Sequence, residues 1–189
     1  MAIQKGALKI NSYRLWSVMP VTSLSTPRLL QYQPTRNRAQ LTVPPRGGSP
    51  GFVKILNKSC IILPDSKGNN RLDSLVNIID TGYIGCLFLI PGIDETLRVN
   101  GLARISTSAE HLDLFSDSRN PPRTCIEITI KEVFLHCAKA LMRSELWSPK
   151  SKIDRSDFPT MGAMINDQLS IIDDPETQED MVARYKRDL

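Results

Sequence analysis

Two short segments rich in cations and glycine carry the side chains best suited to holding a phosphate. In residues 45–48, PRGG, the guanidinium of Arg46 can make two parallel hydrogen bonds to phosphate oxygens, and the glycines let a ligand approach the backbone closely. In residues 67–71, KGNNR, Lys67 and Arg71 precede an apolar periodic segment. A helix that begins here would add unpaired N–H groups to the two cations. Both segments suggest an anion site, with a solvated turn and an ordinary capped helix as the alternatives.

A third group of polar residues lies on a segment with strand-like alternation. In residues 95–101, Thr96, Arg98 and Asn100 share one face of the expected strand. On the inner wall of a barrel these side chains could hydrogen-bond a ring system, whereas on an outer wall they would face water. The pattern is compatible with both.

The fourth group begins at one of the two histidines of the chain. His136 is followed by Lys139 and Arg143 at spacings of three and four, which places them along one edge of a helical continuation. His136 is the best available proton donor, although a structural hydrogen bond is the more common role of a single histidine. Cys137 directly follows it, but the third member of a cysteine protease triad is missing, so hydrolytic chemistry is not expected.

The cysteines indicate free thiols and not a metal site. They lie in apolar, strand-like segments and show no CxxC or Cys/His ligand spacing. We therefore expect buried thiols in a reducing compartment and no metal. The four are Cys60, Cys86, Cys125 and Cys137.

Composition and charge indicate a soluble globular protein that does not bind nucleic acid. The chain has 189 residues, enough for one domain with appendages, and no apolar run approaches the roughly 18 to 20 residues that span a bilayer. Nine of its 24 basic residues and none of its 20 acidic ones precede Asp65. The remainder therefore holds 15 basic against 20 acidic residues and offers little clustered positive charge. We expect no nucleic-acid partner and no membrane partner.

Residues 1–42 differ in composition from the rest of the chain. They contain no acidic residue, no sustained apolar period and many Ser, Thr, Arg, Pro and Gln residues. An organelle transit peptide, a disordered tail and the product of a wrong start codon or reading frame share this composition. The expected location is therefore the cytoplasm or, with a transit peptide, an organelle matrix. If residues 1–40 are a tail or a transit peptide, we expect their removal to leave ligand binding nearly unchanged, because they offer no periodic apolar face to a core.

From residue 43 onward the chain shows strand and helix patterns. A short strand ends at residues 45–48, further strands are expected at 52–56, 59–63, 83–90, 95–105 and 124–136, and helices at 71–79, 108–115, 138–146 and 176–187. Strands joined mainly by hairpins, with one helix inserted after the third, indicate a mainly β, antiparallel α+β barrel. We therefore divide the chain into an extension over 1–42, a barrel domain over 43–147 and a helical C-terminal extension over 148–189.

Local signals predict how several of these elements begin and end. Asn57 and Lys58 suit a tight hairpin turn, and Gly101 marks a β-bulge or a close backbone approach. Asn70 is the expected N-cap of the helix over 71–79, and Ser108 or Ser106 is expected near the cap of the helix over 108–115. The apolar face of the first of these helices consists of Leu72, Leu75, Val76 and Ile79.

Four collinear blocks carry a family resemblance. They are PRGGSPGFVKIL from Pro45, ILPDSKGNNRLDSLVNI from Ile62, GCLFLIPGIDETLRVNG from Gly85, and EVFLHCAKALMRSELW from Glu132. Together they resemble the pyridoxamine 5′-phosphate oxidase-like FMN-binding proteins, in particular their bacterial PPOX-type branch. The final QEDMVARYKRDL also fits, so the resemblance covers residues 43–189 and rests on several ordered blocks, which are more specific than one motif.

The resemblance implies a split β-barrel homodimer with one FMN in each of two clefts between the subunits. It assigns the FMN phosphate to Arg46 with Gly47 and to Lys67, Asn70 and Arg71. It further implies that Leu63 and Pro64 run along the flavin, that Thr96 and Arg98 face the cofactor, and that Lys139 and Arg143 lie on the cofactor or substrate side.

The implied function is that of an FMN-dependent oxidoreductase acting on a small organic substrate, with NAD(P)H or oxygen as redox partner. The alternative is a non-catalytic protein that binds FMN or another ligand. The resemblance ends near Val43, whereas members of this family begin with a helix and a first barrel strand. Residues 35–40 do not look like that strand. We therefore expect the first strand to be absent or replaced by unrelated sequence, which would leave an unpaired edge.

Overall fold

The structure, a computed structural model, describes residues 28–32 and 42–189. The chain divides into two compact units, one ending at Ser144 and the other running from Glu145 to Leu189. What was predicted for residues 1–27 and 33–41 lies outside the described residues.

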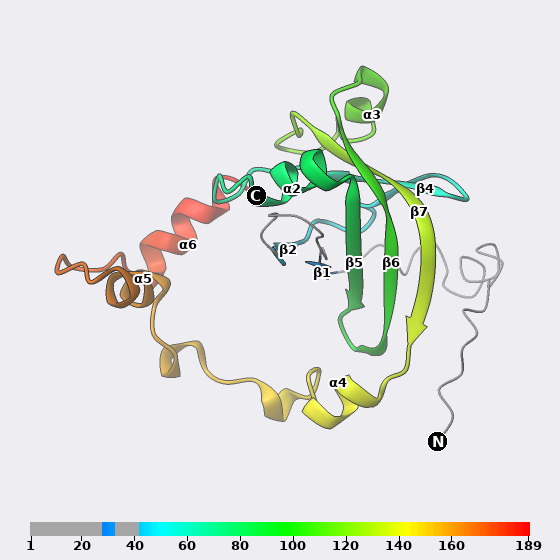
Figure 1. The fold of residues 1–189 in the computed structure, drawn as a ribbon. Helices are drawn as coiled ribbons and strands as arrows, with labels where there is room; N and C mark the ends of the chain where they lie inside the picture. Colours follow the sequence, from blue (N-terminus) through cyan, green and yellow to red (C-terminus); the bar gives the residue numbers. More distant parts are fainter. Residues whose placement is uncertain (1–27, 33–41) are drawn as a thin grey trace. The chain divides into compact units, whose positions relative to one another are not determined.

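The first unit is built on a seven-stranded antiparallel sheet. Its strands are β1 Arg28–Tyr32, β2 Pro45–Arg46, β3 Lys54–Asn57, β4 Cys60–Pro64, β5 Tyr83–Ile90, β6 Ile93–Ser106 and β7 Cys125–His136. Their order is β2-β1-β5-β6-β7-β4-β3, and Figure 1 shows the long strands β5, β6 and β7 side by side. No ladder among the described residues joins β2 to β3, so the barrel is open along that seam. The predicted antiparallel α+β split barrel is confirmed.

The long strands lie where their sequence patterns predicted them. β5 coincides with the range predicted for it, and β6 and β7 differ from theirs by one or two residues at the ends. β5 is paired on both sides, with β1 and with β6. This central position explains its nearly continuous apolar sequence, YIGCLFLI.

Strand β1 lies within the segment that the sequence suggested was an appendage. It pairs antiparallel with β5, where Leu29 lies opposite Phe88, and with β2, where Leu29 lies opposite Arg46. The position expected to be an unpaired edge is therefore occupied by a strand of unrelated sequence. The structure thus places residues 28–32 in the sheet, whereas the sequence analysis assigned all of residues 1–42 to an extension of uncertain structure. Pairing uses backbone groups that every sequence supplies, so a strand of five residues leaves no clear period to detect.

The hairpin between β3 and β4 turns one residue later than predicted. Its turn residues are Lys58 and Ser59, and Asn57 remains in β3. The side-chain Oδ1 of Asn57 accepts hydrogen bonds from the backbone N–H and the hydroxyl of Ser59, at 2.9 and 3.1 Å. An irregularity between Ile55 and Asn57 shifts the register and accounts for the difference.

Gly101 marks the bulge between β6 and β7, as predicted. The register shifts there, because Asn100 pairs with Glu132 and Gly101 pairs with Ile130. A Cβ atom at position 101 would collide with the carbonyl oxygen of Thr129. Glycine is therefore required where the two backbones approach each other.

Apolar side chains of the sheet and of one helix form the core of the first unit. Each fully buried aliphatic side chain contributes roughly 1.5 to 3 kcal/mol relative to an exposed one. The largest of them are Ile61, Ile62, Leu63, Ile78, Ile126, Ile128 and Val99. Most of them come from β4, β6 and β7, so these strands carry much of the stability.

Helix α2, Asp73–Thr81, begins two residues later than predicted. Asn70 is not its N-cap: this residue has a φ of 58°, and Leu72 holds the N-cap position without a side-chain hydrogen bond. Asp73, not a cation, occupies the first turn. An acidic first turn is the ordinary arrangement at a helix N-terminus, so the helix dipole here already has a partner.

The buried face of α2 is also different from the predicted one. The helix buries Ser74, Asn77 and Ile78, whereas Val76 is 50% and Ile79 is 72% exposed. The hydroxyl of Thr42 accepts a hydrogen bond from the Asn77 amide at 3.2 Å and lies 3.5 Å from the Ser74 hydroxyl. The segment before β2 thus satisfies the polar side of the helix, which allows that side to be buried.

Four further helices are among the described residues. α3, Ala109–Asp113, begins after Ser108, whose hydroxyl accepts a hydrogen bond from the backbone N–H of His111 as expected of its N-cap. α4, Lys139–Ser144, follows β7 and contacts β6. The second unit contains the short 3₁₀ turns η2 Pro149–Ser151 and η3 Arg155–Asp157, then α5 Met161–Leu169 and α6 Gln178–Lys186. α5 was not predicted, although its N-cap Thr160 was a usable signal.

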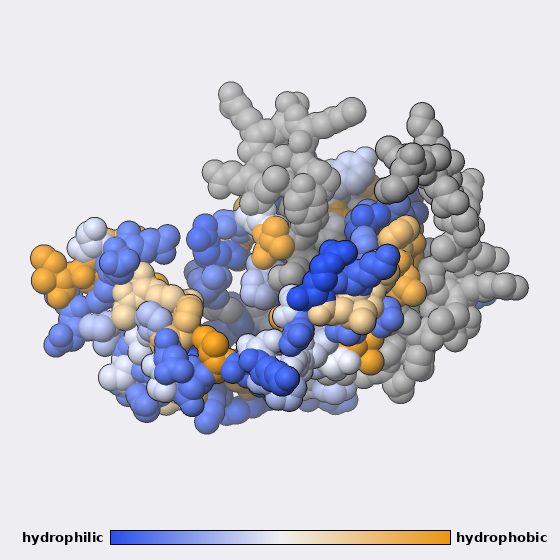
Figure 2. Space-filling view, turned by 90° about the horizontal axis from the view of Figure 1, so that it is seen from below, coloured by the Kyte–Doolittle hydropathy of each residue, from blue (hydrophilic) through white to orange (hydrophobic). Residues whose placement is uncertain are grey.

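Figure 2 shows hydrophobic residues in separate patches between hydrophilic ones on the face seen from below. No described helix is long and apolar enough to cross a membrane.

Three of the four cysteines are buried as predicted, but Cys137 is exposed because it follows the end of β7. Burial raises the pKa of the Cys86 thiol to about 12. Burial is also the main cause that raises the pKa of Cys60 and of Cys125. These three thiols are therefore held in the unreactive protonated form.

We expect a thiol reagent at about pH 8 to modify one cysteine of the native protein quickly and all four after denaturation. Cys137→Ser should abolish the fast phase, and a fast phase that survives this substitution would show that a buried thiol is accessible.

Cys86 should make the free energy of unfolding fall as the pH rises from 9 toward 12, because its thiol ionises near the usual pKa of 9.0 only in the unfolded chain.

Candidate functional site

A cavity of about 760 Å³ gathers most of the residues predicted to hold a phosphate. It lies between β2, the loop that joins β4 to α2, and the loop that precedes β7. Its volume is in the range of sites for cofactors and other small molecules. The predicted cofactor residues that line it are Arg46, Gly47, Pro64, Lys67, Asn70 and Arg71. The fold therefore joins the two cationic segments, which are separate in the sequence, in one site.

Arg46 is the most buried of the cations that line this cavity. Its side chain is 17% exposed, and its Nη1 donates a hydrogen bond to Asp65 Oδ1 at 3.0 Å. Its Nε is buried and has no hydrogen-bond acceptor among the described residues. A buried N–H group without an acceptor is costly, and an anion in the cavity would supply one.

Arg71 is held differently. Its side chain is 73% exposed, and its Nε and Nη2 both lie about 3 Å from Asp73 Oδ2. The guanidinium is thus already engaged by a carboxylate in the first turn of α2. The prediction that a basic first turn marks the phosphate position is therefore not supported, because the basic residue lies before the helix and the first turn is acidic. Arg71 still lines the cavity, but its charge is partly neutralised by Asp73, which its sequence position did not suggest.

The remaining wall of the cavity is rich in rigid apolar rings. These are Pro44, Pro45, Phe52, Pro64, Pro121 and Pro122. Apolar walls with a few polar groups are typical of ligand sites. A cavity with a cationic part and an apolar wall suits a ligand that joins a phosphate to an extended ring system.

Thr96 and Arg98 lie outside this cavity. Thr96 is buried, whereas Arg98 lies with Asn100, Glu132 and Phe134 on a surface that we call the β6–β7 polar face. Glu132 organises it: Arg98 Nη2 lies 3.2 Å and Asn100 Nδ2 2.6 Å from Glu132 Oε2. The Arg98 guanidinium also lies 5.3 Å from the centre of the Phe134 ring. Its Nε, like that of Arg46, is buried without an acceptor in the part of the chain that the structure describes. Both of these unsatisfied arginines belong to the predicted cofactor set.

The remaining predicted site residues do not line the cavity, and His136 lies opposite Thr96 on the ladder between β6 and β7. His136 packs its ring edge-on against Phe134, with the ring centres 4.9 Å apart, and does not line the cavity. Lys139 and Arg143 are exposed on α4. Leu63 is fully buried in the core. The structure of one chain thus brings the phosphate residues together with Pro64, whereas the other predicted residues do not line the cavity.

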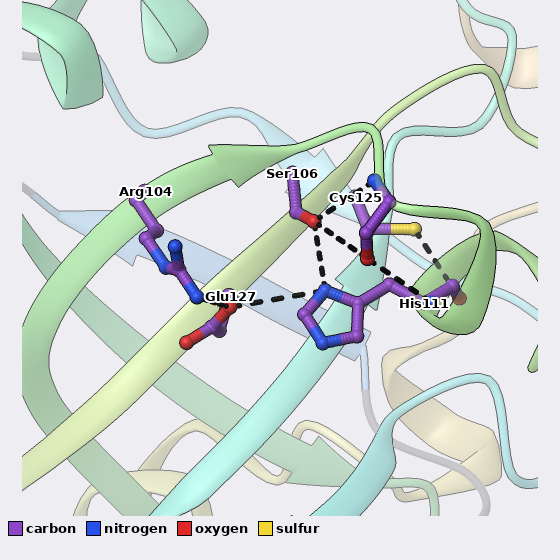
Figure 3. A network of polar contacts seen from close by, with 6 residues as sticks. Arg104, Ser106, His111, Cys125 and Glu127 are labelled. Carbon is purple, nitrogen blue, oxygen red and sulfur yellow. Dashed lines mark hydrogen bonds and ion pairs between the residues drawn. The ribbon is translucent and has the colours of Figure 1, made fainter.

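A polar network around the buried His111, near the start of β7, was missed by the sequence analysis (Figure 3). His111 Nδ1 lies 2.7 Å from the Ser106 hydroxyl and 3.8 Å from Glu127 Oε2, and Arg104 Nη2 lies 2.6 Å from the same carboxylate oxygen. A serine, a histidine and a carboxylate are also the members of a hydrolase triad. Here the serine and the carboxylate approach the same ring nitrogen, so no proton relay through the ring is formed. The network joins α3 to the sheet.

The N-cap at Ser108 was a partial signal for this network, because it fixed the helix on which His111 lies. Nothing in the sequence indicated that Ser106 and Glu127 would meet this histidine, since they come from neighbouring strands. Within residues 28–32 and 42–189, no group of three His, Cys, Asp or Glu side chains could hold a metal ion.

Solved structures share the fold at low sequence identity. HupZ of Group A Streptococcus superposes with a TM-score of 0.50 at 15% identity, covering 63% of this chain and 91% of HupZ. A variant of HupZ gives a TM-score of 0.49 at 14% identity, with 64% and 97% covered. A protein of Lactobacillus delbrueckii, assigned by name to the pyridoxamine 5′-phosphate oxidases, gives 0.43 at 15% identity, with 70% and 97% covered. No protein-family model matches the chain, and no curated protein matches it significantly.

These findings concern the fold. The open antiparallel barrel and the likeness to HupZ agree with the architecture that the sequence blocks implied. The chain shares its antiparallel split-barrel fold with HupZ.

Proposed function

We propose that this chain is an FMN-binding flavoprotein, with oxidoreduction of a small organic molecule as its reaction. The observation that carries the proposal is the cavity in which Arg46, Lys67, Asn70 and Arg71 meet. These are the residues to which the family resemblance assigned the FMN phosphate, and they were chosen from the sequence alone. The family that the sequence resembles binds flavin. The cavity is our reason for proposing the same property for this chain.

The residues present fit FMN in charge and in the apolar character of one wall. The phosphate would take the position beside Arg46, where the buried Nε lacks an acceptor, and would be within the same cavity as Lys67 and Arg71. The isoalloxazine rings would lie along the proline- and phenylalanine-rich wall. A cation that is partly withdrawn from water binds a phosphate more strongly than one on an open surface.

We further propose that the functional unit is a homodimer. One chain places Thr96 and Arg98 outside the cavity, although the resemblance assigns both to the cofactor. A two-fold related copy could bring its β6–β7 polar face to the cavity of the first chain and so complete two equal sites. The buried Nε of Arg98 supports this arrangement, because a group on the partner or on the ligand would supply its acceptor.

In such a protein the flavin supplies the hydride or electron transfer, with NAD(P)H as a candidate partner. The chain itself binds the phosphate, orients the rings and limits the access of water. No catalytic residue is assigned. His136 does not line the cavity of its own chain. It stays a candidate proton donor only if the dimer brings it to the cavity of the partner chain.

A non-catalytic FMN-binding role is the second candidate. The described residues that line the cavity include no His, Cys, Tyr or Glu, and the carboxylate of Asp65 is paired with Arg46. This composition provides for binding more clearly than for proton transfer. Steady oxidation of NAD(P)H by the holoprotein would favour the enzyme, and flavin retention without turnover would favour the binding protein.

The proposal predicts that the purified chain takes up one FMN per chain, seen as flavin absorption that stays with the protein after gel filtration. Light scattering on the same sample should give twice the chain mass of 21.2 kDa. A protein that is folded but retains no flavin after incubation with excess FMN would refute the binding function. A monomer with a full complement of FMN would refute the shared cleft and leave the binding function standing.

A further inference from the structure

Arg123 lines the cavity from the loop between α3 and β7, which no motif in the sequence connects with phosphate binding. It lies far along the chain from the two cationic segments and only the folding of the sheet brings it to them. With it, the cations that line the cavity are Arg46, Lys67, Arg71 and Arg123.

The position of Arg123 is set by contacts of the residue that follows it. The backbone N–H of Asp65 donates to the carbonyl oxygen of Thr124 at 3.0 Å, and the Thr124 hydroxyl lies 3.4 Å from Asp65 Oδ2. The other oxygen of Asp65 accepts the hydrogen bond from Arg46. One carboxylate therefore ties the start of β7 to the guanidinium of Arg46, so the two arginines belong to the same part of the cavity wall.

The arginines that line the cavity differ in whether a carboxylate pairs with them. Arg46 is paired with Asp65, and Arg71 is paired with Asp73. Arg123 makes no side-chain hydrogen bond or ion pair among the described residues, and its side chain is exposed to solvent at the cavity. A guanidinium that no described carboxylate engages is suited to the charge of a phosphate monoester near neutral pH.

We propose that Arg123 contacts the phosphate monoester of the ligand and selects phosphorylated over unphosphorylated forms of it. The inference rests on the proposed function for the identity of the ligand, FMN, and adds a residue and a specificity to it. A guanidinium without a competing carboxylate can turn both of its N–H edges to phosphate oxygens. The ring system lies along the apolar wall and gains nothing from this charge.

The test compares Arg123→Ala with Arg119→Ala as its matched control. Arg119 lies in the same loop, is exposed and carries the same charge, but does not line the cavity. FMN and riboflavin are titrated into the full-length wild type and both variants, with flavin fluorescence as the readout, at low and at physiological salt. Arg123→Ala should weaken FMN binding about tenfold and leave riboflavin binding unchanged, whereas Arg119→Ala should change neither. Arg123→Lys should recover part of the loss.

Each other outcome has a definite meaning. If Arg119→Ala weakens FMN binding as much as Arg123→Ala does, the effect is general electrostatics and the contact is refuted. If Arg123→Ala weakens riboflavin equally, the residue has a structural role and the proposed selectivity is wrong. If the wild type binds no FMN, the proposed function fails, and inorganic phosphate then becomes the probe: stabilisation of the wild type but not of Arg123→Ala against heat would keep the anion site, and equal behaviour of the two would overturn it.

Discussion

Arg46→Ala should weaken FMN binding on the order of tenfold to more than a hundredfold, more than any other single substitution in the cavity. Arg46 is the least exposed cation there, and its buried Nε has no acceptor among the described residues. Loss of a charged hydrogen bond removes about 1.5 to 3 kcal/mol of binding free energy. Arg71→Ala should have a smaller effect, because its guanidinium is mostly exposed and is shared with Asp73. Fluorescence titration of FMN gives both affinities.

The same substitution also removes the partner of Asp65, so stability has to be measured separately. Arg46→Ala should lower the melting temperature of the apoprotein, because Asp65 keeps only the long contact to Thr124. Arg46→Lys preserves that charge balance and should melt nearly like the wild type, but it should still bind FMN more weakly since an ammonium lacks the planar fork. Wild-type affinity in both Arg46 variants would show that the phosphate does not bind at β2.

Removal of residues 1–41 should abolish FMN binding and destabilise the first unit by several kcal/mol, whereas removal of residues 1–27 should do neither. The longer deletion removes β1, which pairs with β5 on one side and with β2 on the other. β5 would then present unpaired backbone groups beside the core, at a cost of about 1 to 3 kcal/mol for each group that stays buried. β2 would lose its only partner in the described sheet, and Arg46 would lose the strand that positions it. The shorter deletion leaves every described ladder in place.

Thermal melts and FMN titrations of both truncated proteins provide the measurement. Leu30→Pro in the full-length chain is an independent variant, because Leu30 lies opposite Leu87 of β5 and Pro45 of β2, and a proline in a strand paired on both sides removes a ladder hydrogen bond. It should lower both stability and FMN affinity. A chain without residues 1–41 that melts and binds FMN like the wild type would show that β1 is no part of the working barrel.

Local sequence patterns were sufficient for the elements whose environment is uniform along their length. The sequence of β5 predicted a buried strand, because a strand that lies between two others, here β1 and β6, is apolar along nearly its whole length. Gly101 was predicted to mark a bulge or a close backbone approach, because a glycine inside a strand pattern usually has one of these two roles. β1 was not predicted, because a short strand held by backbone hydrogen bonds needs no distinctive side-chain pattern.

The sequence by itself indicated the long strands, the antiparallel barrel and three of the four cations that line the cavity, because each depends on the order of a few neighbouring side chains. The tertiary structure alone decided which contacts join distant segments. It placed Asp65 between Arg46 and Thr124, brought Arg123 to the cavity, turned the polar side of α2 inward against Thr42, and left Thr96 and Arg98 outside the cavity. These contacts are set by the strand order and register of the whole sheet, and no local pattern encodes them because their energies depend on partners that lie many residues away.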